Sequence, residues 1–170
     1  MEPNELRALQ APLKERYRQD PRSAKIKARA EATIADEAVA CRVATHAGVT
    51  VAGLHPATGG DGSQACSADM MMEALVSCAG VTLKAVATAM RIELRQARVI
   101  AEGTWDARGT LAVDRDAPIG LTDIDLTFHI DSPADAKKLE KLVDLTERYC
   151  VVWQTLAHPP ALKSRLRTSS

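Results

Sequence analysis

The chain has 170 residues, of which 46% are hydrophobic and 26% are charged. This balance is typical of one soluble globular domain that is long enough to bury a core. The 22 Lys and Arg residues equal the 22 Asp and Glu residues, so the charge does not favour a nucleic-acid or anionic-membrane partner. Because only 3% of the residues are aromatic, the core must consist mainly of aliphatic side chains.

The sequence predicts neither a membrane span nor an export signal. Its most apolar stretch, Ala74 to Leu83, has ten residues before Lys84, whereas a spanning helix needs about 20. The N-terminus lacks a basic region followed by an apolar run. We therefore expect a cytoplasmic protein whose thiols stay reduced. The cysteines are Cys41, Cys66, Cys78 and Cys150.

An N-terminal arm precedes the main domain in our interpretation. Residues 4–19 predict a charged amphipathic helix that Asn4 caps and that ends before Pro21. A short helix with a single leucine stripe is not stable by itself, so we expect it to pack on another part of the protein. The predicted organisation is an arm over residues 1–22 and a single domain over residues 23–170. The stripe consists of Leu6, Leu9 and Leu13.

Alternation with a period of two then predicts an antiparallel meander. Apolar residues alternate with polar ones throughout residues 25–34, which is the pattern of a half-buried strand. Residues 39–43 and 49–51 predict two further strands, joined by a turn at Gly48. Cys41 shares a face with the valines of its strand, so we expect it in the core.

Residues 67–90 predict the most unusual element, a helix that is apolar on nearly all sides. We expect Ser67 to cap this helix, and Asp69 suits the positive end of its first turn. The glycine-rich residues 55–63 lack the Lys-Ser/Thr ending of a phosphate loop, so we interpret them as a connector. A helix this enclosed predicts a sheet on one side and a second subunit on another.

The C-terminal half repeats the order of strands followed by a helix. Alternation predicts strands at residues 99–105 and 122–130, separated by a turn. Ser132 followed by Pro133 marks the start of a helix. Its apolar positions recur at steps of three and four and place Cys150 on the buried face. Together, these elements predict an α+β fold with antiparallel sheets.

Cys78 and Cys150 are open to two interpretations. Each lies among apolar neighbours on or at the end of a helix, so both could be small buried side chains. Alternatively, one is a thiolate activated by a nearby cation, and the other is the thiol that resolves its oxidised form. Neither the cysteines nor the histidines have the spacing of a zinc site, so we expect no metal centre.

Two segments of the chain resemble the OsmC/Ohr family of hydroperoxide-resistance proteins. Residues 67–90, with Ser-Cys-Ala-Gly-Val-Thr at residues 77–82, are similar to the central helix of that family. Arg-Tyr-Cys-Val-Val at residues 148–152 is similar to the family's second cysteine segment. The resemblance covers about residues 25–160, and the N-terminal helix looks like the mark of a subgroup with an added arm.

The resemblance implies an intertwined α+β homodimer in which antiparallel sheets wrap around two long central helices. It also implies a thiol peroxidase. In such an enzyme Cys78 attacks an organic hydroperoxide and becomes a sulfenic acid, Cys150 condenses with it to a disulfide, and a small dithiol of the lipoyl type reduces the pair. The resemblance implies no metal, haem or flavin cofactor.

The chain differs from the family's pattern at the residues that support the reactive cysteine. The family has Pro-Glu at the start of the helix, where this chain has Ser67 and Ala68, so Asp69 becomes the candidate acid. The family's arginine follows a Gly-Gly pair that is not matched here, which leaves Arg29, or Arg42, as the candidate arginine. The alternative function is therefore a non-catalytic OsmC-fold dimer that binds a small apolar ligand or senses oxidants.

Overall fold

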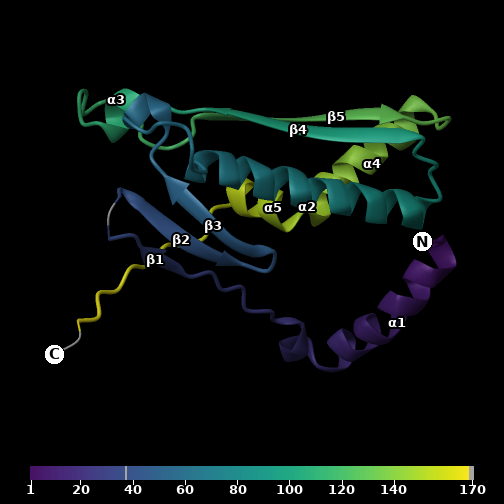
Figure 1. The fold of residues 1–170 in the computed structure, drawn as a ribbon. Coiled ribbons are helices and arrows are strands. Elements are labelled where there is room, and N and C mark those ends of the chain that lie inside the picture. Colours follow the sequence, from purple (N-terminus) through teal and green to yellow (C-terminus); the bar gives the residue numbers. More distant parts are fainter. Residues whose placement is uncertain (37, 169–170) are drawn as a thin grey trace.

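The computed structural model of the chain describes residues 1–36 and 38–168. The fold is α+β, as predicted, and it is built around the long helix α2 (Ser67–Met90). Figure 1 shows a hairpin of two long strands along one side of α2, two further helices behind it, and a three-stranded sheet beside its first half. The N-terminal helix extends away from this body at the opposite end of α2.

The three-stranded sheet has the order β1-β2-β3 and is antiparallel, as the alternation predicts. Its strands are β1 (Ala32–Ile34), β2 (Ala40–Thr45) and β3 (Gly48–Gly53). The turn between β2 and β3 uses Gly48 at a φ of 129°, a conformation that glycine adopts without steric penalty. A 3-10 turn, η2 (Pro56–Thr58), follows in the glycine-rich connector.

The strand predicted over residues 25–34 is much shorter in the structure. Only β1 at its C-terminal end pairs with β2, and the last bond of this ladder is from the Ala44 N–H to the Glu31 carbonyl. The chain turns from β2 into β3 directly beyond this point, so β2 has no further residues to pair with residues 25–30. Ile26 is consequently 81% exposed. The alternation is therefore present without the burial that it predicts.

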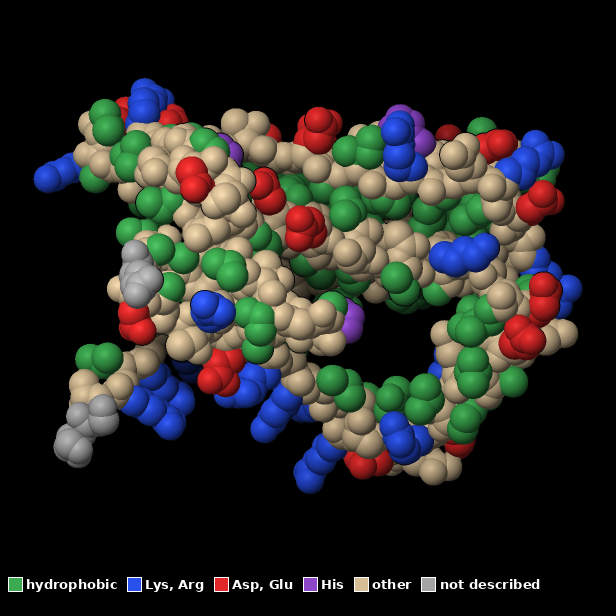
Figure 2. Space-filling model, viewed as in Figure 1, with side chains coloured by type: hydrophobic (Ala, Val, Ile, Leu, Met, Phe, Trp, Pro, Cys, Tyr) green, Lys and Arg blue, Asp and Glu red, His purple; other side chains and the backbone are tan. Residues whose placement is uncertain are grey.

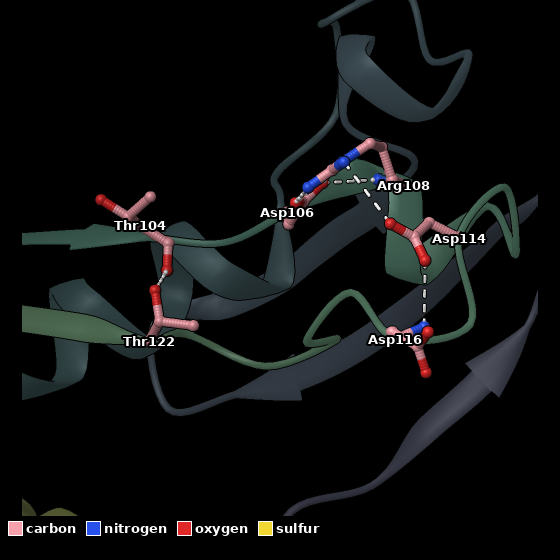
Figure 3. Close-up of polar contacts among 6 residues, drawn as sticks. All are labelled: Thr104, Asp106, Arg108, Asp114, Asp116 and Thr122. Carbon is pink, nitrogen blue, oxygen red and sulfur yellow. Dashed lines mark hydrogen bonds and ion pairs between the residues drawn. The ribbon is translucent and has the colours of Figure 1, made fainter.

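The second sheet is the hairpin of β4 (Gln96–Thr104) and β5 (Asp123–Asp131), which pair along their full lengths. The alternate apolar residues of β5 are half-buried, and the strands pack over α2. The connection contains one helical turn, α3 (Ala107–Thr110), where we predicted a turn. Figure 3 shows how Asp106 and Arg108 hold it, with a 2.9 Å bond from the Arg108 N–H to the Asp106 carboxylate.

Helix α2 buries one stripe of residues spaced by four positions, and this stripe forms the core. Its members Leu83 and Ala87 pack with Leu142 and Ile92 beneath the hairpin. The other faces of α2 are only partly covered within one chain, and Val81 is 73% exposed. The prediction of burial on most sides therefore holds for one face only. The buried stripe consists of Leu75, Ala79, Leu83 and Ala87.

By length and apolar composition, α2 also meets the criteria for a membrane-spanning helix. The expectation that no segment is long enough was therefore wrong, because it counted only the ten most apolar residues and α2 has 24. Core helices of globular proteins meet the same criteria, and the stripe of α2 packs in the core of this fold. The start of α2 also differs from expectation. Cys66, not Ser67, is its N-cap, because the Cys66 carbonyl accepts the first helical bond, from Met70.

Two consecutive helices complete the body. Helix α4 (Ala136–Tyr149) starts three residues later than predicted, because Asp135 rather than Ser132 accepts the N-cap bond, from the Lys138 N–H. The Ser132 hydroxyl donates to the Glu93 carbonyl at 2.6 Å and so ties this loop to the connection between α2 and β4. Helix α5 (Val151–Ala157) was not predicted.

The arm helix α1 (Pro3–Gln19) leaves the body and has no buried residue. Its N-cap is Glu2 rather than Asn4, because Pro3 starts the helix and the Glu2 N–H donates to the Glu5 carboxylate at 2.8 Å. The 3-10 turn η1 (Pro21–Ala24) links it to the body. Figure 2 shows an opening between the arm and the body of the chain.

The core predicts a clear difference between two leucine substitutions. Leu142→Ala removes a side chain with no exposed area and leaves a cavity beneath the hairpin. We expect the free energy of unfolding to fall by about 2–5 kcal/mol. Leu9→Ala on α1, where the side chain is 60% exposed, should change it by no more than about 0.5 kcal/mol. Urea denaturation at a fixed protein concentration measures both, and equal losses would contradict this placement of the core.

Candidate active site

Cys78 and Cys150 come together where α2 meets the junction of α4 and α5. Cys78 lies in the middle of α2 and is half-buried, whereas Cys150 has no exposed area. Helix α2 packs against both α4 and α5. Each thiol shifts the pKa of the other, and all four cysteines of the chain are free thiols. The structure thus brings together the two cysteines that the resemblance pairs.

The position of Cys150 follows from a break in the helix. Its backbone is extended, with φ −74° and ψ 111°, so α4 ends and α5 begins at this residue. Its N–H donates back to the Thr146 carbonyl at 2.9 Å, and its sulfur accepts from the Trp153 N–H at 3.5 Å. One residue therefore caps both helices. The first N–H groups of a helix have no partner within it, and those of Val151 and Val152 lower the pKa of the Cys78 thiol.

This environment moves the pKa values of the two thiols in opposite directions. Burial is the largest single influence on Cys78 and raises its pKa. Hydrogen bonds from the Val152 N–H, the Cys150 thiol and other donors outweigh burial, so the pKa of Cys78 is lowered. For Cys150, burial raises the pKa, and contact with the negatively charged Cys78 raises it further. The pair is therefore polarised, with Cys78 as the thiolate and Cys150 as the thiol that donates to it.

The structure does not bring the candidate acid and arginine to Cys78 within one chain. Asp69 is exposed in the first turn of α2, nine residues before Cys78, which is about 13 Å along a helix axis. Arg29 is 80% exposed in the segment before β1 and is ion-paired with Glu31. Among the described residues, the groups that shift the pKa of Cys78 include no arginine.

Sequence reasoning missed the donors that surround Cys78. The N–H groups of Val151 and Val152 are backbone groups, so their side chains carry no signal of this role. Thr82 is different, because it also lowers the pKa of Cys78 and lies four residues along the same helix. Residues four apart share a helix face, and this spacing could have identified Thr82.

The other two cysteines lie apart from this pair. Cys66 caps α2 twelve residues before Cys78, about 18 Å along the helix axis. Cys41 lies on β2 opposite Ala52 and is half-buried, so its predicted core position is only partly correct. Within residues 1–36 and 38–168, no group of three or more His, Cys, Asp or Glu side chains is placed to hold a metal ion.

An apolar groove of about 590 Å³ runs beside the cysteine pair, between the arm and the body. It contains Thr82 and Tyr149, which neighbour Cys78 and Cys150 respectively, and Lys14 contributes a positive charge from α1. A separate hollow of about 390 Å³ lies at the far end of α2, next to Cys66. We associate the groove, not this hollow, with the chemistry, because its lining includes Thr82, four residues from Cys78 on α2, and Tyr149, next to Cys150 in the chain. Its apolar lining includes Leu6, Val81, Val86, Met90 and Leu145.

Comparison with known proteins identifies the fold. Residues 60–165 match the model of the protein family described as OsmC-like protein. The OsmC-like protein of Mycoplasma pneumoniae has a similar structure, with a TM-score of 0.67 and 16% sequence identity over 79% of this chain and 90% of that one. No curated protein sequence matches the chain.

Two further similar structures have functional names. One is an organic hydroperoxide resistance protein from Legionella pneumophila, with a TM-score of 0.61 and 17% identity over 79% of this chain and 93% of that one. The other is an organic hydroperoxide resistance protein from Elizabethkingia anophelis, with a TM-score of 0.62 and 14% identity over 79% and 92% of the two chains. At these identities the similarity shows a shared fold.

The polarised pair predicts the order in which the thiols are alkylated. Only the thiolate reacts with iodoacetamide, so we expect Cys78 to be modified before Cys150 at pH 7. Because the pKa of Cys78 is lowered, its alkylation should persist to a lower pH than that of an ordinary cysteine. It should then decline as the pH falls through that lowered pKa. Peptide mass spectrometry after timed alkylation measures both rates, and faster modification of Cys150 would contradict the assignment.

Proposed function

Because this chain belongs to the OsmC-like protein family, we propose that it reduces organic hydroperoxides with a pair of cysteines. The pair of Cys78 and Cys150, where α2 packs on α4 and α5, carries this proposal, since one thiol has a lowered pKa and the other a raised one. A peroxidase of this kind needs a thiolate to attack and a second thiol nearby to resolve the product. Two cysteines that only fill space in a core would not require pKa values shifted in opposite directions.

The proposed cycle transfers two electrons from the protein to the peroxide. The Cys78 thiolate attacks the distal peroxide oxygen, the O–O bond breaks, and the alkoxide leaves as an alcohol after taking a proton from solvent. Cys78 is then a sulfenic acid. The Cys150 sulfur attacks it after giving up its proton, water leaves, and a disulfide forms. A small dithiol of the lipoyl type, itself oxidised to a disulfide, returns both thiols.

This cycle uses only protein and dithiol sulfur, so we propose no metal, haem or flavin cofactor. It requires the two thiols to be reduced again after each turnover, which a cytoplasmic location supports. The groove beside the pair favours peroxides with an apolar body, because burial of apolar surface there is favourable. We therefore propose an organic hydroperoxide rather than hydrogen peroxide as the substrate.

We also propose that the protein is an intertwined homodimer. The chain exposes 13148 Å² of accessible surface. A compact monomer of 18.3 kDa would expose only about 8,100 Å². The excess of about 5,000 Å² is larger than a standard protein interface needs. It includes the uncovered face of α2 around Val81 and the extended segment over residues 25–30, which has the alternation of a half-buried strand but no partner.

Asp69 and Arg29 remain our candidates for an acid and an arginine that support Cys78. Within one chain, Asp69 is separated from Cys78 by more than two helical turns, and Arg29 is paired with Glu31. Arg29 lies in residues 25–30, the segment that has no strand partner within one chain and that we expect the second subunit of the dimer to cover. We therefore propose that this support comes across the subunit interface.

The proposed chemistry predicts a specific disulfide. One equivalent of cumene hydroperoxide should link Cys78 to Cys150 within one subunit, because these two thiols are close enough for each to shift the pKa of the other. Cys78→Ser should abolish turnover. Cys150→Ser should allow one oxidation of Cys78 per subunit, after which the sulfur stalls or is oxidised further. Peptide mapping under non-reducing conditions identifies the linked segments.

Cys41→Ser supplies the matched control, since Cys41 lies on β2 away from the pair. It should keep full turnover while losing roughly 1–3 kcal/mol of stability if its hydroxyl finds no partner. A link from Cys78 to Cys66, or two thiols that stay free after treatment, would contradict the mechanism. The second of these results would favour a non-catalytic dimer that binds a small apolar ligand.

The exposed surface predicts the mass in solution. Sedimentation equilibrium at micromolar concentration should give twice the 18.3 kDa of one chain. Val81→Asp, which places a charge on the uncovered face of α2, should shift the equilibrium toward the monomer because burial of an unpaired charge is unfavourable. Val113→Asp is the control, since Val113 is 73% exposed in the loop beyond α3. An 18 kDa species for the natural chain would overturn the dimer.

A further inference from the structure

The hollow at the start of α2 is enclosed by three parts of the chain that are distant in sequence. They are the end of β3 with the connector that follows it, the first turn of α2, and the connection between β4 and β5. Figure 1 shows η2 of the connector beside α3 of the β4–β5 connection at this end of the molecule. The volume of about 390 Å³ lies in the range of pockets that bind small molecules.

The lining of this hollow is mostly apolar, and none of the described residues in it carries a charged side chain. A charged ligand would lose its hydration there without gaining an opposite charge. The lining therefore suits an uncharged ligand with an apolar body. Its larger apolar side chains are those of Leu54, Met71, Trp105, Ile119 and Leu121.

His55, in the same lining, is held in one tautomer by its own turn. Its Nδ1 accepts the Ala57 N–H at 3.0 Å. A backbone N–H can only donate, so in the neutral ring Nδ1 carries no proton and Nε2 carries it. The His55 carbonyl accepts from the Thr58 N–H at 2.8 Å and from the Thr58 hydroxyl at 2.9 Å. These bonds fix the residue at the start of η2 and leave Nε2–H as the donor of its ring.

Two ring N–H groups of the lining have no hydrogen-bond partner within the described residues, namely Nε2–H of His55 and the indole N–H of Trp105. Both residues are half-buried. Residues 1–36 and 38–168 contain no fully buried polar side-chain atom without a partner, so both N–H groups are accessible. The two rings lie at 83° to each other with their centroids 5.3 Å apart. The hollow thus has two neighbouring donors in an apolar lining.

We propose that this hollow binds a small uncharged carbonyl compound with an apolar body, such as an aromatic ketone or ester. The carbonyl oxygen accepts the Nε2–H of His55, with the indole N–H of Trp105 beside it, and the apolar body packs against Met71. The ligand is bound and released without a change in its covalent structure. The site is separate from the cysteine pair, because Cys66 in its lining lies twelve residues before Cys78.

A matched pair of compounds tests this site in the full chain. 2-Acetylnaphthalene is an aromatic ketone, and 2-ethylnaphthalene has nearly the same shape but no acceptor. Equilibrium dialysis measures the affinity of each compound for the natural chain and for His55→Phe, which keeps an aromatic ring beside Trp105 and removes the Nε2–H. His129→Phe is the control, because it makes the same exchange on the exposed face of β5, outside the hollow.

We expect the ratio of ketone affinity to hydrocarbon affinity to fall roughly fivefold in His55→Phe, which is the order expected for one hydrogen bond between uncharged groups. His129→Phe should keep the ratio of the natural chain. If His55→Phe does not fold, as judged by circular dichroism, His55→Asp replaces it with the same expected fall. A carboxylate can still accept the Ala57 N–H but has no proton to donate.

Alkylation shows where the ketone binds. Cys66 and Cys41 are both half-buried, but only Cys66 lines the hollow. Saturating 2-acetylnaphthalene should slow the modification of Cys66 by N-ethylmaleimide and leave the rate at Cys41 unchanged, as measured by peptide mass spectrometry. An unprotected Cys66 would overturn the proposal, and so would an affinity ratio that stays constant in the folded His55 variant or falls equally in His129→Phe. No peroxide is used, so the result is independent of the proposed peroxidase chemistry.

Discussion

The break in the helix at Cys150 is the constraint on which the site depends. If α4 continued through this residue, the N–H groups of Val151 and Val152 would bond to carbonyls of the preceding turn. Because the chain is extended here, those groups instead lower the pKa of the Cys78 thiol, and the Cys150 thiol lowers it as well. One backbone conformation thus supplies both the donors that favour a thiolate and the thiol that can resolve it. The approach of α2 to this junction requires the tight packing around Leu83 and Leu142.

The remainder of the molecule is organised around surfaces that one chain leaves uncovered. Helix α2 is apolar on several faces but buries only one stripe, and the segment before β1 has a strand pattern without a strand partner. The arm helix α1 leaves the body and bounds a groove beside the cysteines without being buried itself. A second copy of the chain would cover these exposed surfaces. The groups that lower the pKa of Cys78, by contrast, already lie within one subunit.

The sequence predicts the elements better than it predicts their partners. The alternate residues of β5 are half-buried, as the pattern predicts, because β4 pairs with β5 along its full length. Residues 25–34 alternate equally well, but most of them stay exposed because β2 turns into β3 and pairs only with β1. The alternation of apolar and polar residues shows which face of a strand suits burial, but it carries no information about which strand lies next to it. The two cysteines could be identified from their segments, and Thr82 from its spacing. The backbone donors of α5 could not, because any residue type supplies an N–H group.

The polarisation of the cysteine pair is the central claim, and an NMR titration tests it most directly. With 13C incorporated at cysteine Cβ, the resonances of Cys78 and Cys150 can be assigned from the Cys78→Ser and Cys150→Ser variants and followed against pH. We predict that Cys78 titrates below the ordinary range of a cysteine thiol and Cys150 above it, and that removal of either thiol moves the pKa of the other toward the ordinary value. Two independent titrations in the ordinary range would contradict the account, because the thiols would then be neighbours without the asymmetry that makes one a nucleophile.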